Sequence, residues 1–142
     1  GFGGNNSMNS FNHYSFGAVG RWMIAYSLGV SRDENSPGFK HFILRPEPDP
    51  TGEMKWARGY YDSMYGRINS SWRVENGVLA YRATVPANTS ATLYLPAESE
   101  KDVKETRREI ANVPGVRFLR FENGKAVYEI SSGEYTFTSS FK

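Results

Sequence analysis

Two copies of the tripeptide Glu-Asn-Gly, each flanked by segments of alternating apolar and polar residues, most constrain how this chain can fold. They stand at 75–77 and 122–124. An Asn-Gly pair between two such segments is typical of a tight hairpin turn, because the turn needs residues that tolerate a left-handed backbone. Both sites therefore predict antiparallel hairpins.

The same alternation recurs in short segments over most of the chain, with Gly, Pro, Asn or Ser between them. The predicted strands lie within 39–46, 54–63, 65–74, 78–86, 90–96, 116–130 and 133–139. About seven short strands joined by polar turns are typical of two packed antiparallel sheets. We therefore expect a mainly β fold, an antiparallel β-sandwich.

The amino-terminal quarter has a different pattern. Residues 1–9 are mostly Gly, Asn and Ser and predict a loop, whereas apolar residues recur at helical spacing from Phe11 to Val30. Only Arg21 interrupts this apolar surface in its middle. We expect one long α-helix over Phe11–Val30 that other elements surround on most sides.

Such a helix finds no helical partner in the rest of the sequence. One sheet could cover one of its sides, and an exposed apolar side usually marks a contact surface. We therefore expect two parts: residues 1–36 as the end of a larger helical body, and residues 37–142 as a β-sandwich domain. The bare side of the helix also favours self-association of this fragment.

Composition argues against several classes of protein. Seventeen Lys and Arg against fifteen Asp and Glu leave a net charge of only +2, without a basic stripe, so we expect no nucleic-acid partner. The chain has no Cys and two His, too few ligands for a transition-metal site, and we expect no metal and no cofactor. No apolar run approaches the roughly 20 residues that span a bilayer, so we expect no membrane partner.

Carboxylates and aromatic residues are the remaining candidates for chemistry. Glu47 and Asp49 lie between prolines, which favours a solvated loop over a metal or catalytic pair. The charged run 98–109 also predicts a solvated surface. An aromatic sugar platform is a further possibility, but alternation around the two tryptophans favours packing in the core. Its candidate rings are Trp56, Trp72, Tyr60 and Tyr61.

Asn12, His13 and Tyr14 stand side by side at the start of the predicted helix. A helix that only fills a core has little use for an imidazole between an amide and a phenol. These polar groups either fix the entrance of the helix or point into a cavity that holds a polar ligand.

Several segments, in this order, resemble the carboxyl-terminal end of bacterial α-L-rhamnosidases of glycoside hydrolase family 78. They are "SFNHYSFGAVGRWM" (10–23), "PGFKHFILRPEPDP" (37–50) and "VPANTSATLYLP" (85–96). The resemblance runs from about Ser10 to the end of the chain and is weakest over 97–113. It implies an (α/α)6 catalytic barrel followed by a β-sandwich, with Phe11–Val30 as the last helix of the barrel.

The resemblance also implies an activity. These enzymes remove terminal, non-reducing α-L-rhamnose from glycosides with inversion at the anomeric carbon, by means of one carboxylic acid and one carboxylate. Both would lie upstream of Gly1, so we expect no catalytic residue in this chain and no hydrolysis by it alone. The substrate-binding candidates are His13, which would hydrogen-bond a rhamnose hydroxyl, and Asn12, which would brace the loop or the helix start.

Two other functions stay open on the residues alone. One is a stand-alone carbohydrate-binding module, which would present aromatic rings on a solvent-facing sheet. The other is a structural or assembly domain, in which the helix would be buried against a partner. For the parent enzyme, a periplasmic or extracellular location is favoured over the cytoplasm.

Overall fold

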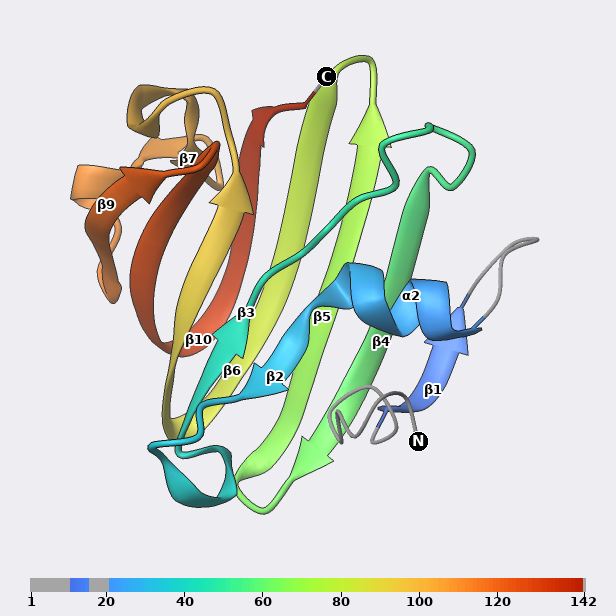
Figure 1. Ribbon diagram of the computed structural model, residues 1–142. Helices are drawn as coiled ribbons and strands as arrows, with labels where there is room; N and C mark the ends of the chain where they lie inside the picture. The colour runs from blue at the N-terminus through green and yellow to red at the C-terminus, as the bar shows by residue number, and fades with distance from the viewer. Residues whose placement is uncertain (1–10, 16–20, 142) are drawn as a thin grey trace.

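The computed structural model describes the backbone of residues 11–15 and 21–141, and the side chains of 25–36 and 38–141 (Figure 1). Strands dominate it, as the alternating pattern predicts. The elements are β1 (Phe11–Ser15), α2 (Arg21–Leu28), β2 (Val30–Arg32), η1 (Pro37–Phe39), β3 (His41–Leu44), β4 (Trp56–Ser63), β5 (Gly66–Glu75), β6 (Val78–Pro96), η2 (Glu100–Asp102), β7 (Lys104–Glu105), β8 (Arg108–Glu109), η3 (Ile110–Asn112), β9 (Val116–Glu122) and β10 (Lys125–Ser140).

The two longest strands, β6 and β10, pair with each other and pass through both layers of the fold. Residues 78–85 of β6 pair with 133–140 of β10, and residues 90–96 pair with 125–131. Between these stretches the register jumps from Ser131–Ser90 to Gly133–Val85. Figure 1 shows both strands turning sharply at this irregularity. A β-bulge at this place lets one hairpin supply strands to two layers.

Pairing with β6 and β10 sorts the other strands into two layers. The first layer has the order β1, β4, β5, β6, β10, β7, β8 and uses the 78–85 and 133–140 halves. The second layer has the order β2, β3, β6, β10, β9 and uses the other halves. The expected sandwich-like β architecture is thus present.

One pairing departs from the expected antiparallel pattern. β3 runs parallel to β6, with His41 opposite Ser90 and Leu44 opposite Leu93. A parallel pair needs a long crossover connection between its strands. Here β4, β5 and the first half of β6 form that connection, so the chain builds most of the first layer before it returns beside β3.

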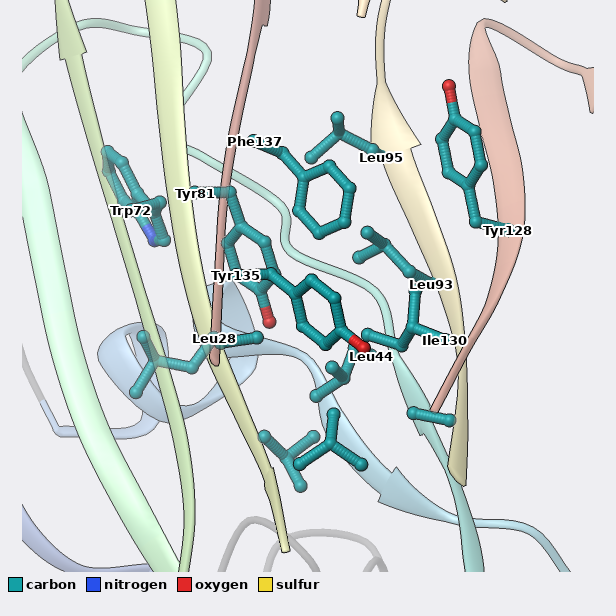
Figure 2. Close-up of a cluster of buried hydrophobic side chains, with 14 of the residues drawn as sticks. Leu28, Leu44, Trp72, Tyr81, Leu93, Leu95, Tyr128, Ile130, Tyr135 and Phe137 are labelled. Atoms are coloured by element: carbon teal, nitrogen blue, oxygen red, sulfur yellow. The ribbon is translucent and has the colours of Figure 1, made fainter. Parts of the chain in front are cut away.

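The core lies between the two layers and is lined by alternate residues of each strand. Trp72, Tyr81 and Phe137 come from the first layer, and Phe42 and Leu93 come from the second; each is at most 2% exposed. Figure 2 shows several of these side chains packed against one another. Burial of large apolar and aromatic side chains is the main stabilising contribution to such a fold.

The long helix predicted over Phe11–Val30 is wrong. Phe11–Ser15 forms strand β1, which pairs with the edge of β4, and the described helix α2 covers only Arg21–Leu28. The cause is tertiary: the edge of β4 offers unpaired backbone groups, which override the helical spacing of the apolar residues. Residues 16–20, which the predicted helix also includes, lie outside the described part of the chain.

The described end of α2 finds its partners within this chain. Ala25 and Leu28 are buried, and the Ser70 hydroxyl donates a hydrogen bond to the Leu28 carbonyl oxygen at 2.8 Å. Trp72 Nε1 donates to the Ser27 hydroxyl at 3.0 Å. The other side of α2 carries Tyr26, which is 56% exposed. For this end, therefore, packing on the sheet replaces the helical neighbours that the sequence pattern required.

Gly29 ends α2 and lets the chain turn directly into β2. Its φ is +69°, a left-handed conformation that favours glycine, and a Cβ there would lie 1.9 Å from the Arg45 carbonyl oxygen. β2 then pairs with β3 at the edge of the second layer. The proposed division between residues 1–36 and 37–142 remains a proposal, although residues from both sides of it share this sheet.

Candidate functional site

The two predicted substrate-binding residues lie on the edge strand β1. His13 stands opposite Tyr60 of β4, and Asn12 lies at the register shift between Phe11 and His13. Their backbone is thus held by pairing with the first layer, and their side chains lie outside the described part of the chain. Their role as sugar ligands stays a proposal.

The carboxylates of the proline-rich segment have structural partners. Lys125 Nζ donates to Glu47 Oε1 at 2.9 Å. Asp49 accepts hydrogen bonds from the Met54 amide at 2.8 Å and from the Thr51 amide and hydroxyl at 2.9 and 2.8 Å. These hydrogen bonds, first of all that from Met54, lower the pKa of the Asp49 carboxyl. The pair is therefore an ordered turn and an ion pair, consistent with the preference against a catalytic site.

A metal site finds no support in the described residues. Within 11–15 and 21–141, no group of three or more His, Cys, Asp or Glu side chains is placed to hold an ion. His41, one of the two histidines, is held between the Ser90 and Thr92 hydroxyls at 2.6 and 2.8 Å. It acts as a cross-strand link between β3 and β6.

Most of the charged run 98–109 is exposed, as its composition predicts, but Glu105 departs from that prediction. Glu105 is 3% exposed and accepts hydrogen bonds from the Thr136 amide at 3.0 Å, the Thr106 hydroxyl at 2.8 Å and Arg108 at 2.8 Å. Burial alone would raise the pKa of the Glu105 carboxyl, but these hydrogen bonds outweigh it and lower the pKa. Glu105 pins the β7–β8 hairpin to β10.

Asp102 makes a similar attachment in the first half of the same run. Its carboxylate accepts hydrogen bonds from the Ser140 amide and hydroxyl at 2.8 and 2.9 Å. Burial would raise the pKa of this carboxyl too, and the hydrogen bonds from Ser140 and the Glu98 amide lower it. The carboxyl end of β10 is thus tied to η2.

The four aromatic candidates for a sugar platform separate into two groups. Trp72 lies in the core, and Tyr61 stacks on Phe39 at 4.6 Å between ring centroids. Trp56 and Tyr60 are half-buried on the opposite face of the first layer. The Arg67 guanidinium carbon lies 3.7 Å from the centroid of the Tyr60 ring and covers it. Trp56 and Trp72 both line a hollow, but Trp72 is only 2% exposed, so Trp56 offers the accessible ring there.

That outer face of the first layer carries two hollows that meet. The larger, of about 460 Å³, is lined by Trp56, Arg58, Ser71, Arg73 and Arg82, among others. The smaller, of about 290 Å³, includes Asn69, Thr84, Glu105, Glu134 and their neighbours. Ser71, Arg82 and Thr136 line both hollows and lie in one row across β5, β6 and β10. We call the joined hollows the outer groove.

A third hollow lies between α2 and the proline-rich segment, with a volume of about 520 Å³. Its lining includes Tyr26, Pro48, Pro50, Met54 and Phe141, together with the engaged carboxylates Glu47 and Asp49. Its wall is mainly apolar. No helix in the described ranges is long and apolar enough to cross a membrane.

Comparison with known proteins gives the class to which this fold belongs. The chain is a member of the bacterial alpha-L-rhamnosidase C-terminal domain family, whose model matches residues 29–109. The match begins directly after α2 and covers the strands from β2 to β8, but not β1, β9 or β10.

Individual relatives carry the same name. An alpha-L-rhamnosidase of Streptomyces avermitilis is 35% identical over 92% of this chain and 12% of its own length. One of Formosa agariphila is 28% identical over 94% of this chain and 14% of its length. The chain thus spans about an eighth of the length of these curated relatives.

Solved structures give the same result for the fold. The crystal structure of the Streptomyces avermitilis alpha-L-rhamnosidase complexed with L-rhamnose matches with a TM-score of 0.69 and 31% identity, over 86% of this chain and 11% of that one. The alpha-L-rhamnosidase of Dictyoglumus thermophilum matches with a TM-score of 0.64 and 25% identity, over 82% and 13%.

Proposed function

We propose that this chain is the carboxyl-terminal part of an inverting α-L-rhamnosidase that removes terminal, non-reducing α-L-rhamnose from glycosides. The observation that carries the proposal is the coverage: the similarity spans 92% of this chain and only 12% of the Streptomyces avermitilis relative. The greater part of such an enzyme, with its catalytic machinery, lies in the remainder.

The contacts of the carboxylates in this chain support the proposal that the catalytic residues lie elsewhere in the enzyme. An inverting glycosidase needs an acid and a base about 6.5–9.5 Å apart with room for water between them. Glu47 and Asp49 share a hollow, but one is paired with Lys125 and the other holds a turn. We therefore propose that both catalytic carboxylates lie upstream of Gly1 and that the isolated chain does not hydrolyse rhamnosides.

The proposed role of this chain is to position a wall of the sugar pocket. Residues 1–36 would lie at the boundary with the (α/α)6 barrel, and residues 37–142 would support the barrel as a sandwich. Pairing of β1 with β4 supports this role, because it fixes the backbone of Asn12 and His13 to a rigid layer. His13 would then hydrogen-bond a rhamnose hydroxyl, and Asn12 would brace the segment.

The test uses the full-length parent enzyme and an aryl α-L-rhamnoside. His13→Ala should raise KM roughly three- to tenfold, the effect of one lost neutral hydrogen bond, and leave thermal unfolding unchanged. His41→Ala is the matched control, because the imidazole of this other histidine hydrogen-bonds the Ser90 and Thr92 hydroxyls on β6, and the KM of this variant should stay unchanged. An unchanged KM for His13→Ala would remove that residue from the sugar pocket.

Stereochemistry and the isolated chain test the rest of the proposal. Proton NMR of the parent reaction should detect β-L-rhamnose as the first product, since inversion converts the α linkage into the β anomer. The purified 142-residue chain should give no turnover of the same substrate. First release of the α anomer, or turnover by the chain, would contradict the proposal.

A further inference from the structure

Three arginines on adjacent strands converge on the larger hollow of the outer groove. Arg58 of β4 and Arg82 of β6 are the two cross-strand neighbours of Ser71 on β5, and Arg73 lies two residues further along β5, opposite Trp56. Neighbouring strands are about 4.8 Å apart, so these side chains start within roughly 10 Å of one another. Their long stems let all three guanidinium groups reach one ligand.

Two of the three arginines, Arg73 and Arg82, have no carboxylate partner among the described residues. By contrast, Arg67, Arg108 and Arg117 each pair with a carboxylate. None of the described residues that line the larger hollow is acidic. Positive charges held close together on one face repel one another, and a bound anion relieves that repulsion.

The remaining walls of the groove suit a sugar. Trp56 presents part of an indole ring beside the arginines, and such rings pack against the apolar face of a pyranose. Ser71 and Thr136 supply hydroxyl groups on the groove floor, where the two hollows join. A planar guanidinium fork binds a planar carboxylate through two parallel hydrogen bonds.

We propose that the outer groove binds an acidic oligosaccharide, with uronic acid carboxylates on Arg73 and Arg82 and a pyranose ring on Trp56. Arg58 would add charge at the same hollow. This site is distinct from any rhamnose pocket at His13, and the inference does not depend on hydrolysis.

The groove lies on the face of the first layer that α2 does not cover. α2 packs on the inner side of this layer, where Trp72 bonds to Ser27. The arginines lie on the opposite side of the same strands. Among the described residues, the outer face therefore stays open to a ligand.

Calorimetric titration of the 142-residue chain with tetragalacturonate tests the proposal. The matched control ligand is the fully methyl-esterified form, which keeps the sugar rings and removes the charges. We expect binding of the acid, weakened by added salt, and no binding of the ester. Equal binding of both ligands, no binding at millimolar concentration, or binding only of a sulfated oligosaccharide would overturn carboxylate recognition.

Variants locate the binding to the groove. Arg82→Gln and Arg73→Gln should each weaken binding about tenfold or more, because each removes a charged hydrogen-bonding pair. Arg117→Gln removes the same charge from β9 of the second layer and should change Kd less than twofold. Circular dichroism should be unchanged in all three variants. An Arg117→Gln loss as large as that of Arg82→Gln would show nonspecific charge attraction and overturn the site.

The full-length enzyme distinguishes a ligand from a protein contact. The same titration on the parent should reproduce the affinity of the 142-residue chain. Binding by the chain and not by the parent would show that another part of the polypeptide fills the groove, which would also overturn the proposal. Rhamnoside turnover is measured separately, so failure here leaves the proposed hydrolase function intact.

Discussion

The inner and outer faces of the first layer are made by the same strands, and they differ in chemistry residue by residue. On β5, buried Trp72 lies between half-buried Ser71 and exposed Arg73. On β6, buried Tyr81 is followed by exposed Arg82. The inner residues pack in the core, whereas the outer residues carry charged groups that make no contact with the core. We infer that the inner face determines stability and the outer face is available for binding.

The two tryptophans of the first layer give the largest expected contrast. Trp72→Ala should lower the free energy of unfolding by about 3–5 kcal/mol, because it empties a fully packed site and leaves the Ser27 hydroxyl without its indole donor. Trp56→Ala on the outer face should cost less than half as much. Urea unfolding measures both, and equal losses would contradict the assignment of the faces.

Glu105 tests the boundary between the two faces, since it lines the outer groove although it is buried. Glu105→Ala should lower the free energy of unfolding by about 1–3 kcal/mol, because the Thr136 amide loses its acceptor. Glu134→Ala, at an exposed position of the same groove, should change it by less than about 0.5 kcal/mol. A neutral Glu105→Ala would show that the hairpin is not pinned in this way.

Low pH should reduce the free energy of unfolding, because it protonates carboxylates that accept hydrogen bonds in the folded state. Hydrogen bonds lower the pKa of Glu105, Asp102 and Asp49 in the folded state, so each ionised carboxylate contributes stability above its unfolded pKa near 4. That contribution is lost as the pH falls through the lower folded pKa values. Urea midpoints should therefore drop between about pH 5 and pH 2, and Glu105→Gln should make the drop shallower. An identical pH profile in the variant would contradict the role of Glu105.

The smallest expected effect is the change in protein stability when an arginine of the outer groove is replaced. Arg82→Gln should change the free energy of unfolding by less than about 0.5 kcal/mol, because the side chain is exposed and forms no ion pair among the described residues. Removal of a like charge beside Arg58 and Arg73 even favours a slight gain. A loss above 1 kcal/mol in urea unfolding would show that the outer face also supports the fold.

Local sequence signals predicted the hairpins whose turns contain Asn-Gly. Asn76 and Gly77, and Asn123 and Gly124, all have positive φ, as such turns require. The β7–β8 hairpin was missed because its turn contains neither Asn nor Gly. Thr106 and Arg107 take the positive φ values there, 48° and 67°. The turn geometry is the same, but the sequence carries no signal for it.

Long-range contacts explain the other errors and the sites that the sequence could not reveal. β1 has helical spacing and becomes a strand only because β4 lies beside it. The burial of Glu105 depends on Thr136, which is distant in sequence. The outer groove joins residues of several strands through register alone, so no contiguous motif marks it. His13 and Asn12, which came from family resemblance, remain predictions.

The continuity of β6 and β10 through both layers has a mechanical consequence. A force or a register slip that starts in either sheet is carried along the same two strands into the other sheet. Neither sheet can separate or melt while the other stays intact, so denaturation of the sandwich should be all-or-none.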